Sequence, residues 1–419
     1  MSEYNKYFRK SFRNLYNYVY DSGDIPFSEK PFNDLDALVM SVLSYLPLET
    51  ILSPEEEMEE VPLPEMITRY LGSLNVDYMG AYYPDFSFRH IVLCWRLLTA
   101  KRYSNSKVIA FESKTSESQR MQFAGVALTL DDGTLAVSYR GTDNTFVGWK
   151  ENLDMAYVPY VPGEGLATGF LKDVMDEYPE RKVRIFGHSK GGNFAVYAAT
   201  SIPSKYQDRI LNIFSIDGLA ICKELKESEA HARIQDKIIL FVPEQSVIGM
   251  LLDHEKVTQV VEAYPKNEVF NQHDIYNWVV SDTEDKLVSA ILQPMGKYFT
   301  ASLNDWFKKT KNMADLDCLL NAMIQACVKL GYTTPDDGFA QGAKVIQNVM
   351  GMPLPREEKR KVNAALLNLL GALNAHRPQL RKEQQAVEKQ KKNKELEMKR
   401  KQKLINQLAA KMDADMRHR

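Results

Sequence analysis

The pattern of apolar positions in the first hundred residues is helical. Apolar side chains recur at helical spacing after Asn33 or Asp34, either of which could cap the helix, and Pro47 ends it. The apolar face comprises Leu35, Leu38, Val39, Val42, Leu43 and Leu46. Residues 90–102 predict a second buried helix, and the acidic, proline-flanked stretch 54–64 predicts an exposed loop between the two.

From Val108 onward the apolar period shortens to that of β-strands. Residues 123–130 and 135–139 predict a hairpin, because the Asp-Asp-Gly between them tolerates the positive φ of a tight turn. Downstream, predicted strands alternate with predicted helices. The strands are 183–186, 210–216 and 237–242, and the helices are 167–177 and 193–201. This alternation implies an α/β fold with a mostly parallel sheet and crossover helices.

The strand pattern stops near Glu284, and residues 287–373 predict several helices. After Pro378 the chain is rich in Lys, Gln and Glu, which is typical of a solvated helix or a disordered tail. We therefore predict four parts. They are an N-terminal helical segment packed on the core (1–105), an α/β core (106–283), a helical C-terminal domain (284–376) and a basic tail (377–419).

Composition limits the class of protein. The chain has 419 residues, of which 44% are hydrophobic and 26% charged, as in ordinary globular proteins. Its four cysteines form no CxxC pair, which favours a reducing compartment over a disulfide framework. The polar start lacks the apolar core of a signal peptide, and no apolar run approaches the roughly 20 residues of a membrane span. We expect a cytoplasmic protein.

The formal net charge of −2 hides an asymmetry. Residues 377–419 carry 14 Lys and Arg against 6 Asp and Glu. This basic tail either serves solubility or makes a weak contact with an anionic surface. No aromatic residues interleave the basic ones, so specific nucleic-acid binding is not expected.

The most informative motif is Gly187-His-Ser-Lys-Gly191, a G-x-S-x-G between a predicted strand and a predicted helix. In that context the serine occupies a sharp, strained turn that projects its hydroxyl above the sheet. Gly187 and Gly191 lack a Cβ, so strand and helix can approach closely. Ser189 is therefore the expected nucleophile. The backbone N–H of Lys190 is an expected oxyanion-hole donor, aided by the helix N-terminus.

Two blocks resemble class 3 lipases, and within them a bacterial lipase-like branch of unknown function. One is the GHSKGG block, and the other is Tyr139-Arg-Gly-Thr142 followed by Trp149. A third block, PFNDLDALVMSVLSYL, resembles the opening of the bacterial branch. The resemblance covers 31–278 and implies an α/β-hydrolase-type, mostly parallel sheet with helices on both faces, plus helical additions at both ends. It also implies that Thr142 supplies an oxyanion-hole donor.

Three further residues of these blocks carry expectations. Lys190 stands where class 3 lipases commonly have leucine. Its side chain could attract an anionic substrate or steady an oxyanion, or it could lie on the surface. Arg140 is expected to pair with a nearby acid, and Trp149 to pack rather than touch substrate.

A serine nucleophile needs a base, and in this fold the order along the chain is Ser, acid, His. The histidines that follow Ser189 are His231, His254, His273, His376 and His418. His273 is favoured, because it follows the last predicted strand region in a QHD…W block similar to one in the bacterial branch. His254 is expected on a helix among charges at the surface, and His188 is expected to pack beside the nucleophile.

The acid is less defined. The resemblance aligns the family aspartate with Ser246, which cannot orient an imidazole as a carboxylate does. Asp217 follows a predicted strand directly and is favoured, while Glu244 is the alternative.

These residues predict a serine hydrolase that cleaves a carboxylic ester, either of a lipid or of a small molecule, through an acyl-enzyme. Amide, thioester or acyl-transfer chemistry would use the same groups. No metal or cofactor is implied. The alternative is an inactive hydrolase fold that serves as a binding module, which the serine at position 246 favours.

Overall fold

The computed structural model describes residues 12–52, 60–74, 85–143, 145–266, 268–310, 312–332 and 341–417. Its core is an eight-stranded sheet in which each strand lies next to its neighbours in sequence. The strands are β1 (Val61–Pro62), β2 (Lys107–Ser116), β3 (Met121–Thr129), β4 (Leu135–Tyr139), β5 (Val183–His188), β6 (Ile210–Ile216), β7 (Ile238–Pro243) and β8 (Val257–Val261).

The sheet has an antiparallel half and a parallel half. Strands β1 to β4 pair antiparallel, and β4 to β8 pair parallel. The β3–β4 hairpin turns at Gly133, whose φ of +79° suits a residue without a Cβ. Because β4 to β8 run in one direction, their carboxyl ends meet at a single edge, where ligands bind in open α/β sheets.

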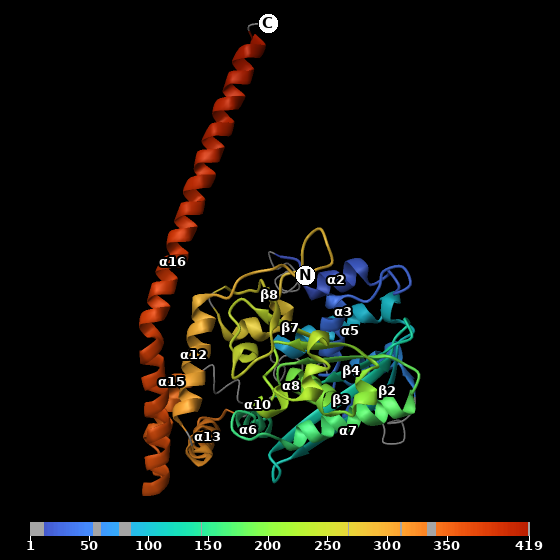
Figure 1. Ribbon diagram of the computed structural model, residues 1–419, viewed down its shortest axis with the longest axis vertical. Coiled ribbons are helices and arrows are strands. Elements are labelled where there is room, and N and C mark those ends of the chain that lie inside the picture. Colours follow the sequence, from blue (N-terminus) through green and yellow to red (C-terminus); the bar gives the residue numbers. More distant parts are fainter. Residues whose placement is uncertain are drawn as a thin grey trace.

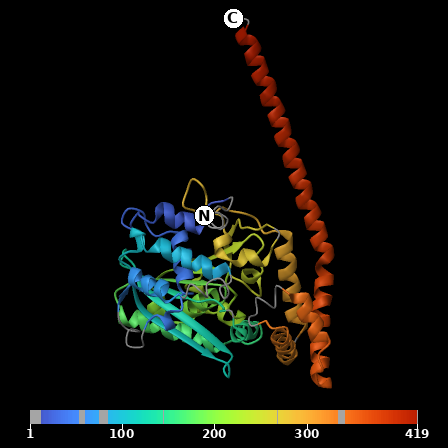
Figure 2. The same cartoon turned by 180° about the vertical axis from the view of Figure 1, so that it is seen from behind.

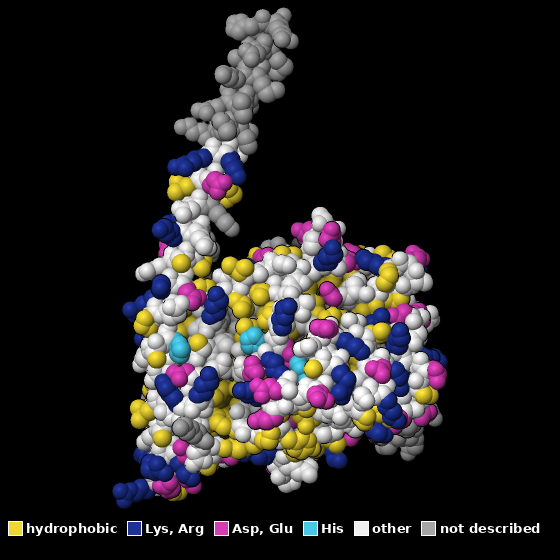
Figure 3. Space-filling view, viewed as in Figure 1, with side chains coloured by type: hydrophobic (Ala, Val, Ile, Leu, Met, Phe, Trp, Pro, Cys, Tyr) yellow, Lys and Arg dark blue, Asp and Glu magenta, His cyan; other side chains and the backbone are white. Residues whose placement is uncertain are grey.

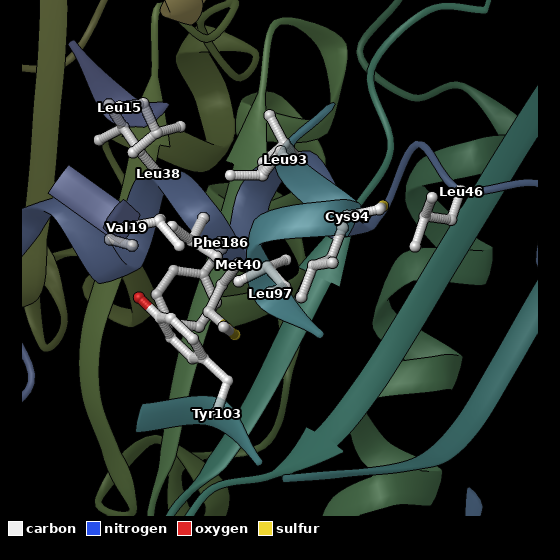
Figure 4. Packing of buried hydrophobic residues seen from close by; sticks show 14 of the residues in the cluster. Leu15, Val19, Leu38, Met40, Leu46, Leu93, Cys94, Leu97, Tyr103 and Phe186 are labelled. Atoms are coloured by element: carbon white, nitrogen blue, oxygen red, sulfur yellow. The ribbon is translucent and has the colours of Figure 1, made fainter. Parts of the chain in front are cut away.

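Helices cover both faces of the sheet (Figure 1). The crossover helices α7 (Pro162–Glu177) and α8 (Lys190–Ser201) pack on one face in one apolar cluster. The N-terminal helices α2 (Leu15–Ser22), α3 (Asp34–Leu43), α4 (Leu63–Ser73) and α5 (Asp85–Leu97) form a second cluster on the other. Figure 4 shows this second cluster, with Leu38 and Met40 of α3 and Leu93 and Leu97 of α5 gathered around Phe186 of β5. The predicted α/β class is confirmed.

Asn33 caps helix α3. Its side-chain oxygen accepts from the N–H groups of Leu35 (2.8 Å) and Asp36 (3.3 Å), and the Asp36 carboxylate accepts from the Asn33 N–H (2.8 Å). The same carboxylate forms a fully buried ion pair with Arg102 at 2.6 Å. The hydroxyl of Tyr18 also donates to it, at 2.8 Å. These contacts hold the parts of the N-terminal segment together.

Short elements complete the core. The helices are α6 (Phe146–Asp154), α9 (Ser204–Gln207), α10 (Lys223–Lys226) and α11 (Glu229–Ala232), and the 3₁₀ turns are η1 (Leu48–Thr50), η3 (Lys101–Tyr103), η4 (Gln235–Lys237), η5 (Ile248–Met250), η6 (Phe270–His273) and η7 (Ile275–Asn277).

The C-terminal part is helical and has its own apolar cluster. Its helices are α12 (Pro294–Lys309), α13 (Met313–Lys329), α15 (Gly342–Met350) and α16 (Arg356–Arg417). The first part of α16 packs along α12, where the Trp306 indole donates to the Ala365 carbonyl at 3.0 Å. The rest projects beyond the body (Figures 1 and 2). The expected boundary between 376 and 377 lies inside this single helix, which includes Pro378.

On the part of α16 whose side chains are described, basic side chains alternate with acidic and apolar ones (Figure 3). Among the described residues, no helix is both long enough and apolar enough to cross a membrane.

Several local expectations differ from the structure. Strand β8 was not predicted, because its residues are mostly half-buried and lack the apolar run of the neighbouring strands. Helix α7 begins at Pro162, five residues before the predicted start at Ala167, since proline suits a first helical turn and the Glu164 carboxylate accepts the Val161 N–H at 2.9 Å. His254 lies in the loop before β8 rather than on a helix. The described end of the predicted exposed loop forms β1 and the start of α4 instead, with Val61 and Leu63 buried. Residues 54–59 of that loop, and His418, lie outside the described residues.

Candidate active site

Ser189 sits at the turn between β5 and α8 in a backbone conformation that L-residues rarely adopt. Its φ is +59° and its ψ is −127°. Such strain persists only where the surroundings fix it. A Cβ on Gly187 would lie 1.9 Å from the Gly191 carbonyl oxygen, and one on Gly191 would lie 2.1 Å from the Tyr139 carbonyl oxygen. Both glycines are therefore required for strand β5, strand β4 and helix α8 to meet at this turn.

Asp217 and His273 lie together at the same edge of the sheet. Asp217 directly follows β6, also at positive φ (+45°), and is buried, with 1% of its surface exposed. Its Oδ2 is 2.6 Å from Nδ1 of His273, which ends turn η6. The His273 side chain is 26% exposed, so this pair connects a buried carboxylate to an accessible imidazole.

The second oxygen of Asp217 also has defined partners. Oδ1 accepts from the Ser246 hydroxyl at 2.5 Å and from the Gly249 N–H at 3.1 Å. Both donors come from the segment after β7. The residue that aligned with the family aspartate is thus a donor to the carboxylate on the neighbouring strand.

The structure does not bring Glu244 to His273. The Glu244 side chain is buried and forms an ion pair with Lys266. Its backbone carbonyl accepts from Gln293 N–H at 2.7 Å. Glu244 therefore connects the end of β7 to the segment leading into α12.

His188, just before the nucleophile, holds the loop that carries His273. Its Nε2 is 2.9 Å from the His273 carbonyl oxygen, and the two rings have centroids 4.4 Å apart. Because a carbonyl can only accept, Nε2 carries the proton and donates, and Nδ1 accepts from the Tyr45 hydroxyl at 2.8 Å. Burial, reinforced by the neighbouring His273, holds the pKa of His188 well below its ordinary value, consistent with this neutral form.

Tyr45 was not singled out by the sequence, although it lies in the third block of the resemblance. Its hydroxyl also accepts a hydrogen bond from the backbone of Gly141. A Cβ on Gly141 would lie 2.1 Å from that hydroxyl oxygen and 3.1 Å from the Ser189 Cβ. The N-terminal helical segment thus reaches the nucleophile through Tyr45, which bridges His188 and the loop after β4. Burial raises the pKa of this hydroxyl, so it stays protonated.

Thr142, three residues after β4 ends, is held by helix α6. The Asn152 amide donates to its hydroxyl at 2.7 Å. The hydroxyl is therefore engaged by the protein, which leaves the expected donor role to the Thr142 backbone N–H. Arg140 pairs with an acid as expected, contacting Glu49 at 3.2 Å, and also donates to the Ser44 carbonyl at 2.8 Å. Trp149 lies half-buried on α6.

The expectations for the Lys190 side chain were wrong. It is fully buried rather than on the surface, and it points to β3 and α6 rather than to a substrate. Its ammonium contacts Glu151 Oε2 at 2.8 Å, and the backbone and side-chain oxygens of Gln122, each at 2.7 Å. Burial lowers the pKa of Lys190, while the Glu151 carboxylate opposes that shift.

A comparison with protein families identifies the family of this chain. A model of the Mbeg1-like family matches residues 97–323, which is more than half of the chain. The match includes the sharp turn at Ser189 between β5 and α8, called the elbow below, and the Asp217–His273 pair. The chain belongs to the Mbeg1-like family. No curated protein matches this Mbeg1-like chain.

Two solved structures are similar to the Mbeg1-like chain. Lipase II from Rhizopus niveus is 17% identical over 38% of this chain and 63% of its own, with a TM-score of 0.27. The Mbeg1-like chain thus spans less than two thirds of that lipase. M37 lipase is 13% identical over 46% of this chain and 74% of its own, with a TM-score of 0.29. In the part of the Mbeg1-like chain that the structure describes, no three His, Cys, Asp or Glu side chains are grouped so as to hold a metal ion.

Proposed function

We propose that the protein is a serine hydrolase that cleaves carboxylic esters through an acyl-enzyme on Ser189. The observation that carries this proposal is the Asp217–His273 contact of 2.6 Å at the sheet edge where the strained Ser189 lies. A serine is a weak nucleophile alone, and a base held by a third group is what activates it.

The roles follow from the contacts. Asp217 occupies Nδ1 of His273, so Nε2 is the nitrogen that can take the Ser189 proton as Oγ attacks the ester carbonyl. The N–H groups of Thr142 and Lys190 donate hydrogen bonds to the carbonyl oxygen and stabilise the negative charge that forms on it. His273 then gives its proton to the leaving alkoxide, which departs as an alcohol. Water, activated by the same histidine, attacks the acyl-enzyme, releases the acid and restores Ser189.

Two hydrogen bonds to Asp217 support this assignment of the acid. A carboxylate that accepts bonds on its second oxygen is fixed in orientation. The alternative of an inactive binding module drew on the serine at position 246. Because Ser246 donates to Asp217, that serine now favours the enzyme.

The test is labelling with a fluorophosphonate probe, which reacts covalently with activated serines. We expect wild-type protein to be labelled on Ser189, with no label on Ser189→Ala. A panel of p-nitrophenyl esters of increasing acyl length then defines the substrate class. Absence of label on folded wild-type protein, or equal label on Ser189→Ala, would refute the proposal.

A further inference from the structure

The side chain of Lys190, the residue after the nucleophile, ends in a buried set of hydrogen bonds. An ammonium group has three N–H donors. That of Lys190 meets three acceptors, two on Gln122 of β3 and one on Glu151 of α6. The Lys190 and Glu151 side chains are both 0% exposed. Each donor of the buried cation is therefore used, as burial of a charge requires.

The acceptors of Lys190 are themselves bound to the loop that follows β4. The Gln122 side-chain oxygen, which accepts from Lys190, also accepts from the Asp143 N–H at 3.3 Å. Asp143 is the residue after Thr142. The ammonium is thus linked through one amide to the backbone next to the expected oxyanion donor.

Glu151 connects the same set of hydrogen bonds to the backbone of β3 and to helix α7. Its Oε2 accepts from the Gln122 N–H at 3.0 Å as well as from Lys190, and its Oε1 accepts from the Gly163 N–H at 3.1 Å in the first turn of α7. The neighbouring Asn152 holds the Thr142 hydroxyl. Helix α6 therefore contacts the Thr142 loop through Asn152 and Lys190 of α8 through Glu151.

We propose that the buried Lys190–Glu151 pair is a positioning device that holds the two halves of the oxyanion hole in register. One half is the backbone N–H of Lys190 itself, at the start of α8, and the other is Thr142, on the loop after β4. This inference rests on the proposed function. It makes Lys190 and Glu151 positioning residues, because neither side chain touches the reacting atoms.

The reason for a charged pair here is geometric. The two donors belong to segments 48 positions apart in the chain, and an oxyanion hole works only when its donors are fixed at hydrogen-bond distance from the developing charge. An apolar side chain at position 190 would fill the same volume without directional contacts. The ammonium instead fixes the separation of α8, β3 and α6 through its three hydrogen bonds.

The experiment compares Glu151→Gln with Asp36→Asn. Both changes convert a fully buried carboxylate to its amide, and both carboxylates are ion-paired. The carboxylate of Asp36, however, bonds to Tyr18, Asn33, Arg102 and Tyr103, all of the N-terminal segment. For p-nitrophenyl butyrate we expect Glu151→Gln to lower kcat at least tenfold with KM within twofold, at a temperature where circular dichroism shows each variant folded. Asp36→Asn should keep kcat within twofold.

Three further variants make the test decisive. Lys190→Met should match Glu151→Gln, and the double variant should lose no more than either single one, since the pair acts as a unit. If Glu151→Gln does not fold, Glu151→Asp keeps the charge on a shorter side chain, and a kcat loss of severalfold at unchanged KM is expected.

A second readout needs no turnover. Amide hydrogen exchange in the segments 137–146 and 186–195 should speed up at least tenfold in Glu151→Gln and stay unchanged in Asp36→Asn. Equal kcat and equal exchange in the two variants would overturn the inference. If wild-type protein neither labels nor hydrolyses esters, the proposed function fails, and the exchange comparison still decides whether the pair positions the loop.

Discussion

The hydroxyl of Ser246 donates a 2.5 Å hydrogen bond to the carboxylate of Asp217. The two residues follow the ends of adjacent parallel strands, with Asp217 directly after β6 and Ser246 three residues after β7. This relationship explains how the site can keep an oriented imidazole with no acid at position 246.

Removing the Ser246 hydroxyl should weaken the orientation of Asp217 without touching substrate. One hydrogen bond to a charged group contributes about 1.5–3 kcal/mol, and only part of it acts in the transition state. We therefore expect Ser246→Ala to lower kcat for p-nitrophenyl butyrate by about tenfold at unchanged KM. Ser246→Asp should be worse, because two carboxylates would lie in contact. Full activity in both variants would show that Ser246 does not support the acid.

The identity of the acid is tested by Asp217→Asn against Glu244→Gln. Loss of the acid in a serine triad lowers kcat by about 10⁴-fold, since the imidazole takes the wrong tautomer. We expect a loss of that order for Asp217→Asn. Glu244 pairs with Lys266 instead, so Glu244→Gln should change kcat less than threefold while lowering the melting temperature. The reverse order of the two kcat values would move the acid to Glu244.

Tyr45→Phe should separate the N-terminal segment from the site. It removes the hydroxyl that donates to His188 Nδ1 and accepts from Gly141. We expect a loss of stability of about 1 kcal/mol by urea denaturation and a severalfold loss of kcat. Tyr157→Phe is the matched control, because its hydroxyl donates to Phe307 O at 3.2 Å on the C-terminal side. Equal kcat values in the two variants would contradict a role for Tyr45 at the site.

The buried Glu164 carboxyl should make the free energy of unfolding depend on pH. Burial raises its pKa to about 7 from an ordinary value of 4.5. Between these values the folded protein binds more protons than the unfolded chain, so the free energy of unfolding falls as pH rises from about 4.5 to 7. The difference corresponds to about 3 kcal/mol. Urea denaturation at pH 5 and pH 8 should show this loss in wild-type protein, and Glu164→Gln should reduce it. An unchanged pH dependence in the variant would exclude Glu164 as the source.

The elements that could be predicted from sequence are those with local signals. The G-x-S-x-G turn is defined by glycines within two residues of Ser189, and the mostly apolar strand β6 leads directly to Asp217. The QHD…W block singled out His273, which the structure brings to Asp217 from 56 positions away.

The other contacts of the site join residues far apart in the chain, and the sequence near each residue does not indicate its partner. Tyr45 meets His188 across 143 positions. It lies just past the end of α3, and nothing in the sequence around it distinguishes this tyrosine from a core residue. The burial of Lys190 depends on Glu151 and Gln122, whose roles appear only when α6 and β3 are placed beside α8. Charge alone suggested a surface position, because an unpaired buried lysine is costly and its partner was unknown.

Helix α16 has 62 residues, and at about 1.5 Å per residue it extends roughly 93 Å. A 47.9 kDa particle with such a rod has a larger frictional coefficient than a sphere of equal mass. A monomer will therefore elute early from a sizing column, at the volume of a larger compact protein. The number of copies in solution must accordingly be determined from mass, by light scattering or sedimentation equilibrium, and the maximum dimension in small-angle scattering will report the rod directly.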